Sequence, residues 1–102
     1  MNRHIQIAII DWQGISVKVS YEPEWLNIGG QHRIAHLQLC SVSPERAALP
    51  VTETGYRSHF LTPKEVAAAG GPLAYARMWL DEAACGSAWT QHQEQARQLA
   101  LF

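Results

Sequence analysis

The N-terminal part of the chain alternates residues with the period of two that β-strands require. Residues 4–10 are nearly all apolar, and one face of this run carries Ile5, Ile7 and Ile9. The other face carries Ala8 and Ile10, and because both faces are apolar we expect a strand that is covered on both sides. Residues 15–21 alternate strictly, with Ile15, Val17, Val19 and Tyr21 facing inward. The turn signal at residues 11–14 joins the two runs and predicts a β-hairpin.

The next stretch predicts a loop and one or two further strands. Pro23 and the Gly29-Gly30 pair punctuate residues 22–31, which we expect to form a loop. Trp25 is apolar for a loop, so part of this segment is expected to fold back as a lid. Residues 33–42 predict a third strand, with Ala35, Leu37 and Leu39 facing inward. Residues 56–60 are a candidate fourth strand.

The C-terminal part of the chain changes to helical spacing. Thr62-Pro63-Lys64-Glu65 is a capping box with proline at the first helical position, so a helix is predicted over residues 63–69. Gly70-Gly71 ends it, and residues 72–85 predict a second helix. Its expected core stripe is Leu73, Ala76, Leu80 and Ala83. A third, mostly polar helix is expected over residues 88–97, anchored by Trp89.

Together these elements predict an α+β domain. A three- or four-stranded antiparallel meander is expected to pack against two or three C-terminal helices. Residues 1–97 would form this single domain, and residues 98–102 a C-terminal tail that can act as a short linear motif.

Composition narrows the function classes. The chain has 102 residues, a net charge of −1 and 17% charged residues, so bulk electrostatics do not predict nucleic-acid binding. The N-terminal apolar run is too short and too interrupted for a signal peptide or a membrane span, and a cytoplasmic protein is expected. Cys40 and Cys85 are expected to be reduced thiols.

One candidate corner for chemistry lies just before the first helix. Glu53, Tyr56, Arg57 and His59 fall within seven residues. Beside a helix N-terminus, the basic pair would form an anion site, or a general base with an electrostatic partner. The structural alternative is a turn at Thr54-Gly55, with a Glu53–Arg57 ion pair and core aromatic residues. The corner therefore carries either an anion-binding or catalytic function, using Tyr56, Arg57 and His59, or none.

No metal or cofactor motif accompanies this corner. The histidines His4, His32, His36, His59 and His92 are scattered, and no carboxylate or cysteine completes a ligand set at a known spacing. Gly29-Gly30 and Gly70-Gly71 lack the flanking residues of phosphate loops. The sequence thus predicts neither a metal site nor a cofactor.

The last five residues form an apolar segment after the polar helix. They resemble the pentapeptide by which bacterial polymerases and repair proteins bind the DNA sliding clamp, Gln-Leu-Ser/Asp-Leu-Phe. Gln98, Leu99, Leu101 and Phe102 match that motif, and Ala100 departs from it. The resemblance implies binding to the clamp through these four residues. In the structural alternative, Leu99, Leu101 and Phe102 fold back onto the core.

A broader resemblance spans most of the chain. The residues that carry it are Tyr21 and Pro23, the run 50–60, Gly70-Gly71-Pro72, Trp79-Leu80-Asp81 and the closing Leu-x-Leu-Phe. They resemble small uncharacterised proteins of proteobacterial plasmids and other mobile elements. The resemblance implies an accessory protein that acts on host machinery. We therefore expect a non-enzymatic interaction protein with the clamp as partner. The alternative is an inhibitor of a bacterial defence nuclease, of the anti-CRISPR or anti-restriction kind, that binds through a sheet face or the Trp25 segment.

Overall fold

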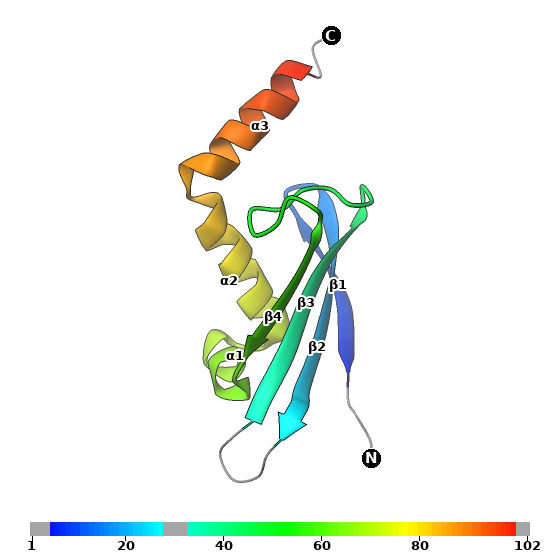
Figure 1. The fold of residues 1–102 in the computed structure, drawn as a ribbon, viewed down its shortest axis with the longest axis vertical. Helices are drawn as coiled ribbons and strands as arrows, with labels where there is room; N and C mark the ends of the chain where they lie inside the picture. The colour runs from blue at the N-terminus through cyan, green and yellow to red at the C-terminus, as the bar shows by residue number, and fades with distance from the viewer. Residues whose placement is uncertain (1–4, 28–32, 100–102) are drawn as a thin grey trace.

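The computed structural model describes residues 5–27 and 33–99. Four strands come first and three helices follow (Figure 1). The strands are β1 (Gln6–Trp12), β2 (Ile15–Asn27), β3 (Arg33–Ser43) and β4 (Tyr56–Leu61). The helices are α1 (Pro63–Ala69), α2 (Pro72–Ala84) and α3 (Ser87–Leu99). The predicted α+β architecture is confirmed, with four strands and three helices in the described part of the chain.

The strands form one antiparallel meander in the order β1-β2-β3-β4, so β1 and β4 are its edges. The β1–β2 hairpin closes where Trp12 pairs with Ile15. Its two turn residues have positive φ, 49° at Gln13 and 81° at Gly14. Such a turn matches the right-handed twist of the flanking strands. The hairpin predicted from residues 11–14 is therefore confirmed.

The core lies between the sheet and the helices. In Figure 1, α1 and α2 lie on one side of the sheet, and α3 continues from α2 beyond the end of the sheet. The buried strand residues are Ile10, Trp12, Val17, Val19, Tyr21, Ala35, Leu37, Leu39 and Leu61, and the helices add Val66, Ala76, Leu80 and Trp89. The inward faces predicted for residues 15–21 and 33–42 are confirmed, because burial of these side chains removes the apolar area that drives folding.

Two strand predictions are wrong. The predicted loop from residue 22 is strand through Asn27, because Pro23 sits at a register shift between Glu22 and Leu26. Proline is tolerated at such a bulge, where the hydrogen-bond ladder is already interrupted. β1 is also not covered on both faces: the helices lie on one side of the sheet, and on the other side of β1 the side chain of Ile7 is 62% exposed.

α1 begins at the predicted capping box. The Thr62 hydroxyl accepts from the backbone N–H of Glu65 at 3.2 Å, and the Glu65 carboxylate accepts from the backbone N–H of Thr62 at 2.8 Å. These bonds satisfy donors that every helix start leaves without an intrahelical partner. Gly70, at φ 105°, closes the helix in the left-handed conformation. The bounds predicted for this helix are confirmed.

α2 carries the main contact between the two layers. Ala76 and Leu80 are fully buried, as predicted, but Leu73 is exposed. Leu73 lies in the first turn of α2, beside the edge strand β1, where no further strand of the described chain covers it. α3 is attached mainly through Trp89, whose ring centroid lies 5.7 Å from that of Trp12. The Gln93 side chain adds a hydrogen bond of 3.0 Å to that of Gln13.

Candidate functional site

The face of the sheet that points away from the helices has no described element packed on it, and we call it the outer face. Strand alternation places one set of side chains there. This set comprises Ile5, Ile7 and Ile9 before and on β1, Lys18 and Ser20 on β2, His36, Gln38 and Cys40 on β3, and Tyr56, Ser58 and Phe60 on β4. Three polar side chains, Ser20, Gln38 and Ser58, lie side by side across β2, β3 and β4, in the same cross-strand row as Ile7. The next row along the strands holds His36 and Phe60.

The aromatic residues form a packed group on the outer face, which we call the aromatic cluster: Trp25, His36 and Phe60. The His36 and Phe60 rings stack with centroids 4.6 Å apart. The Trp25 ring lies 4.7 Å from Phe60 and 6.1 Å from His36. Trp25 remains 38% exposed and Phe60 50% exposed. An exposed, ordered aromatic group of this kind is typical of protein contact surfaces.

Backbone register assembles the cluster from three strands. His36 of β3 lies opposite Phe60 on β4 and opposite Glu22 on β2. The register shift after Glu22 then inserts extra residues into β2, and Trp25 is one of them. Trp25 therefore belongs to a strand of the sheet, whereas we expected it in a loop that folds back as a lid. From the sequence alone, Trp25, His36 and Phe60 are separate apolar or outward-facing residues. Only the pairing register of the strands shows that their rings meet.

The polar neighbours of His36 order its ring. Its Nε2 forms a short hydrogen bond with the Ser58 hydroxyl, and its Nδ1 lies 3.4 Å from the Gln38 side-chain nitrogen. A hydrolytic triad needs a group that accepts from the second ring nitrogen, and donors for the oxyanion. The neighbour of Nδ1 is an amide nitrogen, which donates. The arrangement thus holds the imidazole in its stack on Phe60.

The structure separates the four residues of the predicted corner. Tyr56 points to the outer face, whereas Arg57 and His59 occupy the alternate positions of β4, which face the helix side. Glu53 lies before β4 and lines a small hollow with Trp89 and His92. Arg57 and His59 share one side of β4, and Tyr56 and Glu53 lie elsewhere.

His59 is packed between the layers. Its ring centroid lies 4.7 Å from that of Trp79, and its Nε2 lies 3.4 Å from the Tyr75 hydroxyl. Burial, followed by the charges of Glu65 and Glu82, raises the pKa of Tyr75. The hydroxyl therefore stays protonated at neutral pH and can donate to the imidazole. This contact joins β4 to α2.

Other chemical groups are dispersed. Within residues 5–27 and 33–99, no cluster of three histidine, cysteine or acidic side chains has the geometry to hold a metal ion. Cys40 and Cys85 are free thiols. None of the helices in the same ranges combines the length and the apolar character needed to cross a membrane.

Of the predicted clamp-binding residues, Gln98 and Leu99 fall in the last turn of α3. Leu101 and Phe102 lie outside the described residues. α3 continues through Leu99, so it includes the first two residues of the predicted tail.

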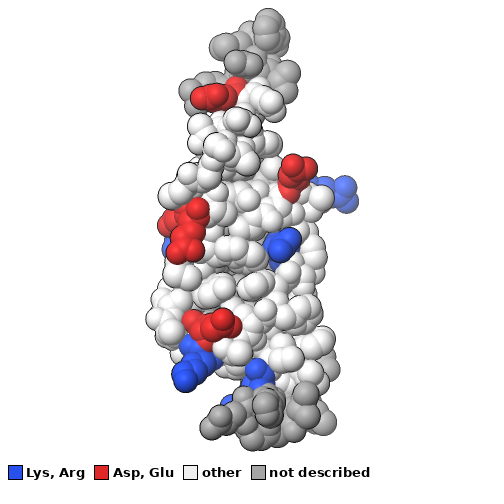
Figure 2. Space-filling view, turned by 60° about the vertical axis from the view of Figure 1, so that its left-hand side comes forward, with Lys and Arg blue, Asp and Glu red and all other residues white. Residues whose placement is uncertain are grey.

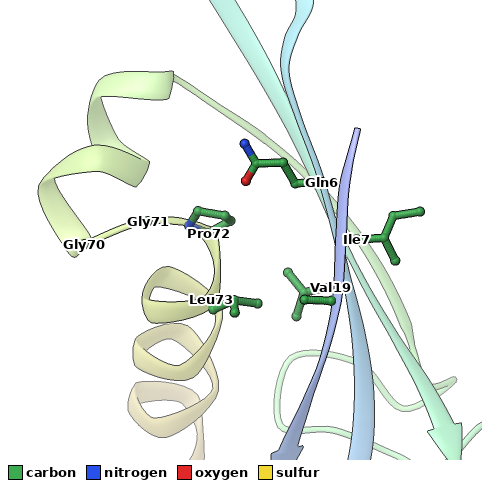
Figure 3. A pocket seen from close by; sticks show the side chains of 8 residues that line it. Gln6, Ile7, Val19, Gly70, Gly71, Pro72 and Leu73 are labelled. Carbon is green, nitrogen blue, oxygen red and sulfur yellow. The ribbon is translucent and has the colours of Figure 1, made fainter. Parts of the chain in front are cut away.

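A groove runs along the helix side of β1 (Figure 3). It has a volume of about 270 Å³ and lies between β1 and the turn from α1 to α2. In Figure 3, Gln6, Val19 and Leu73 extend toward it, while Ile7 points to the opposite side of the strand. Ala8, Gly70, Gly71 and Pro72 also line it. The edge strand is therefore accessible on both of its faces.

Residues 5–89 match the family model described as the KlcB third domain. The chain belongs to this family. KlcB is a plasmid-borne protein of the IncP kil/kor region, so the expected plasmid setting is confirmed at this level. The KlcB match covers the whole sheet, α1 and α2, and ends at Trp89, within the first turn of α3. Neither a curated protein nor a solved structure matches the chain significantly.

Proposed function

We propose that this KlcB-family chain is a non-enzymatic protein-binding module of a plasmid-encoded protein, and that it binds through the aromatic cluster. The observation that carries the proposal is the exposed Trp25–His36–Phe60 stack on an outer face that no described element covers. Tryptophan and other aromatic residues are enriched at the centres of protein interfaces, where they supply large contact area at low entropic cost.

Charge favours a protein partner over a nucleic acid. Among the outward positions of the described strands, Lys18 is the only lysine or arginine, and Arg33 at the start of β3 faces Glu24 at 3.9 Å. Binding to a nucleic-acid backbone requires a row of basic side chains. Figure 2 shows the helix side, where red and blue groups are scattered over a mostly uncharged surface.

A bacterial defence nuclease is the partner class that we propose for the aromatic cluster. A plasmid gains from proteins that act against such enzymes in a new host, and contact through the sheet and Trp25 is independent of the C-terminus. This assignment rests on the plasmid family and on the exposed position of Trp25.

The test compares two matched serine substitutions. Trp25→Ser and Met78→Ser each remove an exposed apolar side chain, the first from the aromatic cluster and the second from α2, where Met78 is 41% exposed. Purified chain is titrated against purified restriction and CRISPR nucleases, with binding followed by calorimetry. We expect Trp25→Ser to weaken binding at least tenfold and Met78→Ser to leave it unchanged. Equal affinity of the two variants, or no binding of the parent chain to any nuclease, would overturn the assignment.

The sliding clamp is a second candidate partner, favoured by the direction of α3. This helix leads away from the sheet (Figure 1), and its hydrogen bond from Gln93 to Gln13, in the turn between β1 and β2, lies five positions before Gln98. Gln98, Leu99, Leu101 and Phe102 would be the residues that contact a clamp groove. Deleting residues 98–102 should abolish binding to purified clamp, and Trp25→Ser should not. The opposite pattern would remove the clamp as a partner.

A further inference from the structure

β1 is an edge strand without the usual protection of an edge. Natural proteins blunt such strands with lysine, proline or inward-pointing charges, because the free N–H and C=O groups otherwise pair with another strand. Residues 6–10 contain none of these, and Asp11 at the hairpin end is the single charged residue of β1. The exposed fractions of Ile5, Ile7 and Ile9 on the outer face all exceed one half.

The sequence of β1 is complementary to itself. If two copies of the strand pair antiparallel about a twofold axis at Ile7, residue numbers in each pair add to 14. Ile5 then lies opposite Ile9 of the second copy, and Ile7 opposite Ile7. A twofold interface requires this reciprocity, and β-branched pairs stabilise adjacent strands. No like charges oppose each other over residues 5–9.

The side chains on the helix-facing side of β1 are compatible with the same antiparallel register. Gln6 would lie opposite Ala8 of the second copy, so the longest inward side chain meets the shortest one. The groove beside them has a volume of about 270 Å³ and is rimmed by Leu73 (Figure 3). Gln6 of each copy therefore has room, and the exposed Leu73 gains apolar neighbours across the axis.

We propose that two copies of this chain pair through β1, in antiparallel register about Ile7, to form a continuous eight-stranded sheet. The helices of both copies then lie on one side. Both aromatic clusters lie on the other side, well away from the axis because they are on the middle and far strands of each sheet. Such a dimer presents two copies of the proposed contact surface in one direction, which raises avidity for a partner with two sites.

Sedimentation of the purified full chain over a range of concentrations tests the dimer. We expect the mass to rise from that of one 11.4 kDa chain to twice that value. Ile7→Lys should remain at the mass of one chain, because the substitution places the lysines of the two copies opposite each other at the axis. Met78→Lys should still dimerise. Ile7 is exposed, so circular dichroism should show both variants folded. A parent chain that stays monomeric, or an Ile7→Lys variant that dimerises normally, would overturn the proposal.

Cysteine substitution tests the register. In a Cys40→Ser, Cys85→Ser background, Ile7→Cys should form an intermolecular disulfide on mild oxidation, because the residue faces its own copy across the axis. Ile9→Cys should not, but the double variant Ile5→Cys, Ile9→Cys should. A dimer in which Ile9→Cys crosslinks and Ile7→Cys does not would refute pairing about Ile7. A foreign strand on β1 instead of a second copy would leave all three variants uncrosslinked.

Discussion

The indole N–H of Trp12 donates a hydrogen bond of 2.9 Å to a carboxylate oxygen of Asp81. The bond joins the end of β1 to α2 across 69 positions of sequence. Trp12 is otherwise enclosed in the core and packs against Trp89. One side chain therefore touches the sheet, α2 and α3.

Removing the acceptor should destabilise the fold. Asp81→Ala leaves the N–H of a buried indole without its partner, and the free energy of unfolding should fall by about 1–3 kcal/mol. Urea unfolding followed by far-UV circular dichroism measures the change. Glu82→Ala, at the neighbouring exposed position of α2, is the control and should change stability by less than about 0.5 kcal/mol. Equal losses in the two variants would show that the bond does not stabilise the fold.

Loss of the N-cap should weaken the start of α1. Thr62→Ala removes the hydroxyl that accepts from Glu65, at a cost of about 1 kcal/mol in unfolding free energy. Thr62→Ser keeps that oxygen and should unfold at nearly the same urea concentration as the parent chain. If the serine variant is as unstable as the alanine variant, packing of the methyl group is responsible and not capping.

The same capping box predicts a pH dependence. The hydrogen bond from the Thr62 backbone, and then that from its side chain, lower the pKa of Glu65. A carboxyl whose pKa is depressed by folding contributes stability above its unfolded pKa, and that contribution is lost as pH falls through the folded value. The stability difference between the parent chain and Glu65→Gln should be present at pH 7 and shrink below the ordinary carboxyl range. Urea unfolding at several pH values measures it, and a constant difference would contradict the assignment.

Two glycines separate backbone conformation from steric contact. Gly14 and Gly55 have φ of +81° and +80°, but a Cβ on Gly14 meets nothing within 4 Å, while one on Gly55 lies 2.8 Å from backbone atoms of Arg46. Gly14→Ala should therefore cost only the left-handed conformation, about 1–2 kcal/mol. Gly55→Ala should lower the thermal unfolding midpoint considerably more. Equal midpoints would mean that the connection between β3 and β4 moves aside freely.

The parts of the fold set by local signals were predicted well. The capping box predicted the start of α1 and Gly70-Gly71 predicted its end, and all of these residues lie within ten positions of each other. The alternation of residues 15–21 gave their inward face. These signals depend on neighbours in sequence, and no distant contact overrides them.

The errors have a common physical origin in the sheet as a whole. The pattern of residues 4–10 predicts a strand covered on both faces, and nothing in it shows that the helices cover only one side of the sheet. Pro23 looked like a loop residue, because a bulge becomes visible only when the partner strand is known. The aromatic cluster was missed for the same reason, since Trp25 and Phe60 are 35 positions apart and meet through register.

The meander also bears on the order of events during synthesis. Each strand pairs with its neighbour in sequence, so all three strand pairings are available once Leu61 has left the ribosome. Such nearby pairings close faster than distant ones. Until α2 follows, the buried side chains of Val17, Leu37 and Leu39 face water. We therefore expect a ribosome-bound chain that has just exposed Leu61 outside the ribosome to recruit chaperones, and one that has also exposed Leu80 to escape them.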